Sequence, residues 1–188
     1  TADEKTNGLV ATIIGHDGIA VIINKSQPAI LNLTTEQLAK IYCGQIVNWK
    51  DLGGTDKKIN VISREDGSGT RDGFEHAIKS KVSGWKILTD KQEVNSTSAV
   101  MSNVYTTVDS IVYISVGYTS KIASNTALIK VDGVEPTVQN ILSKAYPIQR
   151  DLILATKGVA TGATAALIQW ILGAEGQQIV ENKGFIKK

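Results

Sequence analysis

The sequence is poor in the residues that build disulfide frameworks and metal sites. Cys43 is the single cysteine among 188 residues, and His16 and His76 have no histidine or cysteine neighbour at ligand spacing. An intrachain disulfide and a multi-cysteine metal site are therefore excluded, and no metal or other cofactor is expected. We interpret Cys43 as a small, buried apolar residue.

The sequence also lacks an excess of one charge and any long apolar run. The formal net charge is +2, with both signs interspersed and no aromatic residues among the lysines, so no nucleic-acid partner is indicated. No run approaches the length of a membrane span, and residues 1–7 are polar, without a signal pattern or a lipid-attachment cysteine. We expect a soluble chain whose compartment stays open, because a signal can be removed or lie upstream.

What the sequence does contain is an alternation of strand and helix patterns. Residues 9–24 are apolar and β-branched and indicate two strands, or one long strand with a break at 15–18. Further strands are expected at 59–63, 111–114, 127–131 and 152–155, and helices after the capping box of Thr34 and Gln37, near Thr70, at Ser96, at Pro136, and over 161–172 and 174–181. This alternation predicts an α/β layered fold.

The segment 63–71 joins a strand pattern to a helix pattern and concentrates donors for an anion. Gly67 and Gly69 allow a sharp turn and leave backbone N–H groups uncovered. Ser68 and Thr70 add hydroxyl groups, and Thr70 is expected to open the helix. Exposed N–H groups at a helix N-terminus form a site for an oxyanion.

Two arginines and an aspartate flank these donors. Arg64 stands at the end of the strand and Arg71 in the first helical turn, so guanidinium groups add to the helix terminus. Asp66 is either a turn residue or an acceptor that orients Arg64 as a fork. The bland alternative is a strand-to-helix turn that carries surface charges, but the convergence of donor types at one helix start favours an anion site.

Rival motifs fail on spacing. Gly69 is followed by Thr70 rather than by a lysine, so the loop is no nucleotide-binding P-loop. Glycines lie directly beside Ser68 and not two residues away, which excludes a hydrolase elbow. The segment 83–86 matches a serine-x-x-lysine pattern that we read as coincidence, and His76 is expected to be solvated. Trp49 is interpreted as a packing anchor.

At this point the sequence resembles a family, the phosphate-binding proteins that serve bacterial phosphate ABC transporters. The resemblance covers nearly the whole chain, and the loop together with a tryptophan turn makes it specific. The matching blocks are residues 17–24, 33–38, 46–51, 64–71, 146–154 and 175–186. Val112 departs from the glycine that the family tends to have ahead of the tyrosine.

The resemblance implies a periplasmic-binding-protein-like α/β fold of two lobes. Residues 1–24 correspond to a tail and a strand that crosses between lobes, 25–144 to a complete second lobe with the anion loop, and 145–188 to the return crossing with the last strand and helices of the first lobe. The opening part of the first lobe, which supplies a hydroxyl loop and an aspartate that accepts the proton of hydrogen phosphate, has no counterpart here.

For the site, the resemblance implies that Arg64 pairs with inorganic phosphate, that Ser68 and Thr70 donate through hydroxyl and backbone groups, and that Gly69 donates through its amide. The remaining loop residues are expected in support, Asp66 by orienting Arg64, together with Gly67 and Arg71. The implied partner is the membrane permease of an ABC importer, outside the cytoplasm, and the missing first-lobe segment or a polypeptide that supplies it.

Two other functions stay open from the sequence alone. An isolated anion-binding or regulatory module is favoured by the missing first-lobe portion. An enzyme of phosphoryl or acyl chemistry lacks an evident base, nucleophile or metal set beside the loop.

Overall fold

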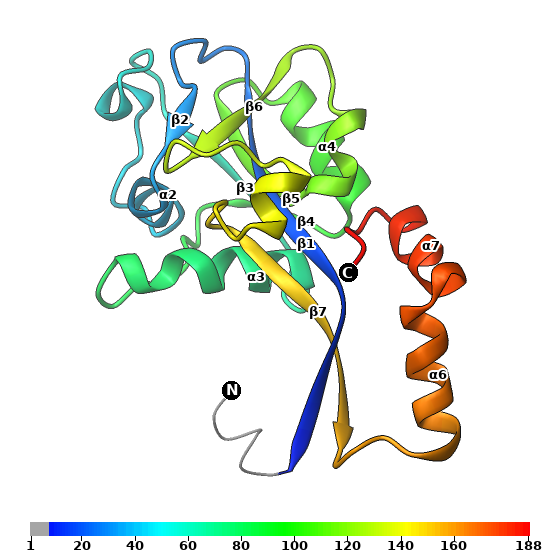
Figure 1. Cartoon of the computed structure of the whole chain (residues 1–188). Helices are drawn as coiled ribbons and strands as arrows, with labels where there is room; N and C mark the ends of the chain where they lie inside the picture. Colours follow the sequence, from blue (N-terminus) through cyan, green and yellow to red (C-terminus); the bar gives the residue numbers. More distant parts are fainter. Residues whose placement is uncertain (1–7) are drawn as a thin grey trace. The chain divides into compact units, whose positions relative to one another are not determined.

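The computed structural model describes residues 8–188, in which the chain forms two compact units (Figure 1). The larger unit is Gly18–Gln149, and the smaller one combines the described residues up to Asp17 with Arg150–Lys188. The unit boundaries fall within strand β1 (Leu9–Asn24) and at the start of strand β7 (Gln149–Lys157). Both strands therefore contribute residues to each unit.

The larger unit is built on a mixed sheet. Its strand order is β2-β6-β1-β5-β3-β4, with β2 at Asn32–Leu33, β3 at Asn60–Arg64, β4 at Gln92–Val94, β5 at Ser110–Ser115 and β6 at Thr126–Val131. β1 runs antiparallel to β5 and β6, whereas β3 runs parallel to β5 and β4. The expected α/β layered fold is confirmed.

Four α-helices belong to this unit, and short capping side chains start them. They are α2 (Thr35–Tyr42), α3 (Gly69–Ile78), α4 (Thr97–Thr106) and α5 (Val138–Leu142), with 3-10 turns at Trp49–Leu52, Lys79–Lys81 and Val116–Lys121. The capping box of Thr34 and Gln37 is present, and Ser96 caps α4. The expectation for Pro136 is wrong, because Thr137 is the N-cap of α5 and the proline precedes it.

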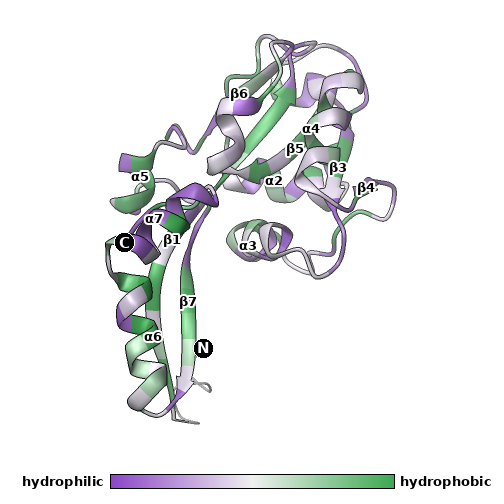
Figure 2. Cartoon of the chain, turned by 90° about the vertical axis from the view of Figure 1, so that its right-hand side faces the viewer, coloured by the Kyte–Doolittle hydropathy of each residue, from purple (hydrophilic) through white to green (hydrophobic). Residues whose placement is uncertain are grey.

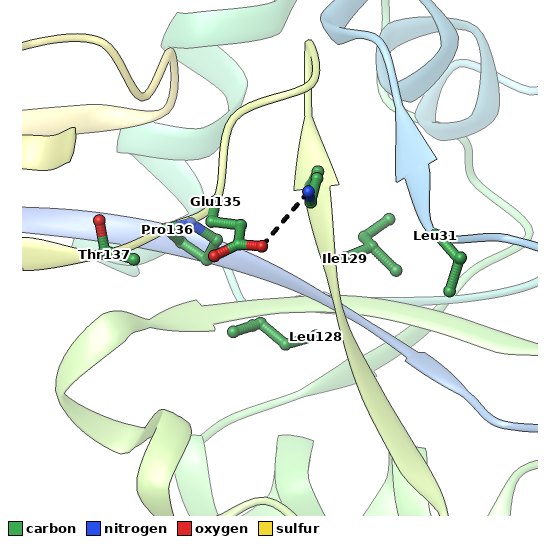
Figure 3. Close-up of a pocket in the computed structure, with 7 residues that line it drawn as sticks. Leu31, Leu128, Ile129, Glu135, Pro136 and Thr137 are labelled. Carbon is green, nitrogen blue, oxygen red and sulfur yellow. Dashed lines mark ion pairs between the residues drawn. The ribbon is translucent and has the colours of Figure 1, made fainter.

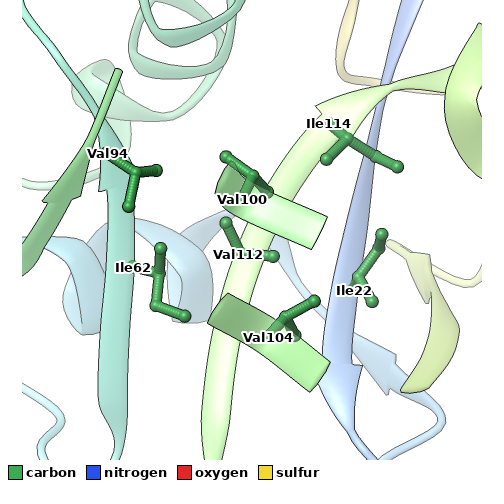
Figure 4. Close-up of a cluster of buried hydrophobic side chains, with 7 residues drawn as sticks. All are labelled: Ile22, Ile62, Val94, Val100, Val104, Val112 and Ile114. Carbon is green, nitrogen blue, oxygen red and sulfur yellow. The ribbon is translucent and has the colours of Figure 1, made fainter. Parts of the chain in front are cut away.

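Strand β5 carries the core on both of its faces. Val112 and Ile114 point to one face of the sheet, where Val100 and Val104 of α4 pack on them. The same buried cluster includes Ile22 of β1, Ile62 of β3 and Val94 of β4 (Figure 4). Val112, the departure from the family pattern, is thus a core residue beneath α4. Tyr113 points to the other face and stacks on Phe74 of α3, with ring centroids 4.1 Å apart. Tyr42 of α2 meets the edge of Phe74 at 4.7 Å.

Trp49 anchors the turn that precedes β3. Its side chain is fully buried, and Nε1–H donates to the carbonyl oxygen of Asp109 at 2.9 Å. The interpretation of Trp49 as a packing anchor is confirmed.

The smaller unit consists of paired strands and two helices, α6 (Gly162–Leu172) and α7 (Ala174–Asn182). β1 continues through Gly15 as one strand, so a single long strand is confirmed but the break expected at 15–18 is wrong. The N-terminal part of β1 pairs with β7. A Cβ atom at Gly15 would lie only 3.0 Å from the carbonyl oxygen of Ile186. Among the described residues, no helix has both the length and the apolar character needed to cross a membrane.

Much of the apolar surface of this unit is exposed. Helix α6 is largely hydrophobic along its length (Figure 2), yet Leu167 is 55% and Trp170 47% exposed. Ile179 of α7 and Val159 before α6 are exposed as well. A helix that is apolar on most of its surface is ordinarily buried.

Replacing Phe74 by alanine tests how α3 is held on the sheet. Phe74→Ala removes a fully buried ring that contacts Tyr42 and Tyr113, so we expect the free energy of unfolding to fall by about 3–5 kcal/mol. Urea denaturation followed by circular dichroism measures this change. Val47→Ala, at a half-exposed apolar position, is the control, and an equal loss in both variants would contradict the assigned role.

Candidate anion-binding site

The segment 65–68 carries the chain from the end of β3 to the start of α3. Gly67 has a φ of +82°, a left-handed conformation that glycine adopts without strain. Ser68 has extended backbone angles, and its Oγ accepts from the N–H of Arg71 at 3.4 Å. The expectation that Thr70 opens the helix is therefore wrong, because Ser68 is the N-cap and the helix begins at Gly69.

The start of α3 brings together the small residues expected to bind an anion. Gly69 is exposed and Thr70 half-buried, whereas Ser68 is almost completely buried. The first turn of an α-helix holds N–H groups that lack acceptors within the helix. The positive end of the helix dipole lies at the same place, so this end of α3 favours an anion.

The Arg64 guanidinium is held on two sides. Nε donates to Oε2 of Glu65 at 2.7 Å and Nη2 to Oε1 of the same carboxylate at 2.8 Å. Nη1 donates to Oγ1 of Thr97, in the first turn of α4, at 3.3 Å. The Arg64 side chain is only 13% exposed. Glu65 and Thr97 are residues that sequence reasoning missed; adjacency to Arg64 was the one signal for Glu65, and Thr97 is 33 residues away along the chain.

The guanidinium of Arg71 bonds groups of the loop and of α3 themselves, and we call this set of contacts the Arg71 clasp. Its Nη1 donates to the carbonyl oxygen of Arg64 at 3.1 Å, and its Nε to Oε1 of Glu75 at 2.6 Å. Nη1 also lies 2.7 Å from Oδ1 of Asp66. With 10% of its side chain exposed, Arg71 ties the end of β3 to the first turn of α3.

The expected pairing of Asp66 with Arg64 is not met in this structure. The side chain of Asp66 is 94% exposed, and its carboxylate pairs with Arg71. Glu65, directly next to Arg64, takes both N–H groups on one edge of the guanidinium. Glu65 thus makes the contacts to Arg64 that were expected of Asp66.

Tyr113 holds the end of strand β3 through its hydroxyl group. Its hydroxyl accepts from the backbone N–H of Arg64 at 3.2 Å and lies 2.8 Å from Oγ of Ser63. Burial raises the pKa of Tyr113, so the hydroxyl stays protonated at neutral pH. The backbone at Arg64 is therefore held by a neutral, buried group.

The other candidates lie outside this arrangement. His76 is exposed, as expected, and Ser83 and Lys86 are exposed on a turn and the segment after it. Cys43 is half-buried, so the expectation of a buried residue is wrong, and its Sγ lies 3.6 Å from the carbonyl oxygen of Lys40. Within residues 8–188, no group of three or more His, Cys, Asp or Glu side chains could hold a metal ion.

A separate cavity lies at the edge of β6. It has a volume of about 350 Å³, and its walls are mainly apolar apart from an ion pair of Lys130 with Glu135, 3.3 Å between Nζ and Oε1 (Figure 3). Its lining residues are Leu31, Leu128, Ile129, Lys130, Glu135, Pro136 and Thr137. None of them belongs to the anion loop, and the apolar walls do not suit an inorganic anion.

The Glu65 carboxylate reports directly on its pairing with Arg64. The hydrogen bond from Arg64 lowers the pKa of Glu65 from 4.5 to about 2. The contribution of the pair to stability is thus complete above about pH 4.5 and is lost as the pH falls through about 2. An NMR titration of the Glu65 carboxyl carbon is expected to show this midpoint, and Arg64→Ala to return it toward about 4.3. A midpoint near 4.3 in the unchanged chain would contradict the pairing.

Comparison with known proteins places this chain in a family. The model of the PBP superfamily domain matches residues 1–175. Phosphate-binding protein PstS of Borreliella burgdorferi is 32% identical over 99% of this chain and 68% of its own length, and the Bacillus subtilis protein of the same name is 30% identical over 98% and 61%. A substrate-binding protein from Clostridium perfringens, solved with bound phosphate, has a TM-score of 0.78 and 38% identity over all of this chain and 75% of its own.

The chain thus spans 61–68% of the length of these two curated relatives. The matched stretches cover 98–99% of this chain. The chain belongs to the PBP superfamily and, within it, to the family of the phosphate-binding proteins.

Proposed function

We propose that this chain binds inorganic phosphate as part of the solute-binding component of an ABC-type phosphate importer. The observation that carries the proposal is the Arg64 guanidinium, held beside the segment that leads into the N-terminus of α3. In the proposed complex Arg64 pairs with the anion, Ser68 and Thr70 donate through hydroxyl and backbone groups, and Gly69 through its amide. Each charge-assisted hydrogen bond contributes about 1.5–3 kcal/mol.

The proposed role is binding without turnover. A catalytic role for Ser68 requires a base within hydrogen-bond reach, but its Oγ accepts from the Arg71 backbone and His76 points to solvent. The buried Tyr113 hydroxyl has a raised pKa and is a poor base at neutral pH. The proposed partner is a permease in the membrane. Because an importer takes up its solute from outside the cytoplasm, the proposed place of action is also outside the cytoplasm.

A first-lobe segment is proposed to complete the smaller unit, either on a longer natural chain or on a separate polypeptide. Support comes from the exposed apolar residues of α6 and α7, including Leu167, Trp170 and Ile179, which an added α/β layer would cover. The greater length of the relatives agrees with this. That segment would supply the acceptor for the proton of hydrogen phosphate.

Removing the guanidinium tests the assigned site. Arg64→Ala deletes the paired cation, so we expect the dissociation constant for phosphate to rise by roughly 10- to 100-fold, in line with the loss of one charge-assisted bond. Isothermal titration calorimetry measures the change. Lys58→Ala removes an equal charge from an exposed ion pair and is the control. Unchanged phosphate affinity in Arg64→Ala would refute the site.

Competition with sulfate tests the role of the missing acceptor. Arginine and amide donors accept phosphate and sulfate alike, whereas a carboxylate acceptor favours the anion that carries a proton. We therefore expect weak phosphate binding by this chain alone and competition by sulfate at similar concentration. Tight phosphate binding that resists excess sulfate in calorimetry would show that the described chain already contains the discriminating group.

A further inference from the structure

We propose that Glu65 and Thr97 are the positioning residues of Arg64, holding one edge and one terminal nitrogen of the guanidinium so that its remaining N–H groups form a fork for the anion. This inference rests on the phosphate site proposed above. It assigns the orienting role to residues other than Asp66.

Glu65 holds the guanidinium by its Nε edge. The carboxylate accepts from Nε at 2.7 Å and from Nη2 at 2.8 Å, which is the side-on geometry of a bidentate pair. Such a pair fixes the plane of the guanidinium as well as its position. Glu65 itself is fixed through its backbone, whose N–H donates to the carbonyl oxygen of Val94 on β4 at 3.1 Å.

Thr97 holds the opposite end of the group. Its Oγ1 accepts from Nη1 at 3.3 Å and comes from α4, a helix capped by Ser96. Val100 and Val104 bury the same helix in the core of the larger unit. The acceptor therefore stands on a rigid element and needs no ordering when the anion arrives.

The bonds that remain define what Arg64 can bind. A guanidinium has five N–H groups in a planar fork, and the contacts to Glu65 and Thr97 use three of them. One N–H is left on each terminal nitrogen. Two N–H groups on neighbouring nitrogens match two oxygens of a tetrahedral oxyanion. In the proposed complex these two N–H groups bind the anion, because the side-on edge of Arg64 is already occupied.

Asp66 does not serve this purpose. Its carboxylate pairs with Nη1 of Arg71 at 2.7 Å, and 94% of its side chain is exposed. An exposed, singly paired carboxylate orients its partner weakly. In this proposal Asp66 holds Arg71, whereas Glu65 and Thr97 hold Arg64, the residue that binds the anion.

Two conservative substitutions separate positioning from charge. Glu65→Asp keeps the charge but withdraws the carboxylate by one methylene, and Thr97→Val keeps the shape but removes the acceptor. We expect each to raise the dissociation constant for phosphate about fivefold, the value of one modest hydrogen bond. Glu135→Asp and Thr106→Val, the same substitutions at exposed positions, are the matched controls and are expected to stay within about twofold of the unchanged chain.

An NMR measurement on the phosphate-free chain tests the same contacts without relying on affinity. In the unchanged protein the Arg64 Nε–H is expected to give a resolved signal that exchanges slowly with water, because Glu65 accepts from it. Glu65→Asp should speed this exchange, whereas Asp66→Asn should not. A purely structural role in stability would not move this signal selectively while the backbone amide spectrum stays the same.

The outcomes are distinct. Loss of phosphate binding in Arg64→Ala, with unchanged affinity in Glu65→Asp and Thr97→Val, overturns the positioning role and leaves the proposed function standing. Unchanged binding in Arg64→Ala refutes the proposed site itself. Fast Nε–H exchange that responds to Asp66→Asn and not to Glu65→Asp assigns the orienting role to Asp66 and refutes the inference.

Discussion

The proposed anion site depends on the hydrogen bond that the Arg71 guanidinium donates to the carbonyl oxygen of Arg64. This contact joins the last residue of β3 to the first turn of α3 and closes the loop between them. Carboxylates of Glu75 and Asp66 hold the same guanidinium in place. Without this hydrogen bond, the proposed donor Arg64 on β3 and the proposed donors at the start of α3 would not be held close to one another.

Strand β5 supplies the support on which both halves of the site rest. Val112 on one face packs beneath α4, which carries Thr97 to Nη1 of Arg64. On the other face, Tyr113 packs against α3 and bonds the Arg64 backbone through its hydroxyl. Neighbouring residues of β5 thus point to opposite faces of the sheet, and one contacts α4 while the next contacts α3. The rigidity of the site follows from the core and not from the loop itself.

The two units differ in how completely they bury their apolar residues. The larger unit encloses its core between helices on both faces of a sheet. The smaller unit leaves Leu167 and Trp170 of α6 largely exposed, although α6 is apolar enough to be a buried helix.

Local sequence signals determined the element pattern, the caps of α2 and α4, the α/β class and the position of the glycine-rich loop, because glycine turns, caps and periodicity act within a few residues. They misassigned the start of α3, because Ser68 and Thr70 are both suitable N-cap residues. In the structure Ser68 has the extended backbone angles of the N-cap. Tertiary structure alone decided which carboxylate meets which arginine and brought Thr97 from 33 residues away to Arg64. Such pairings depend on how strands and helices pack, which no local pattern encodes.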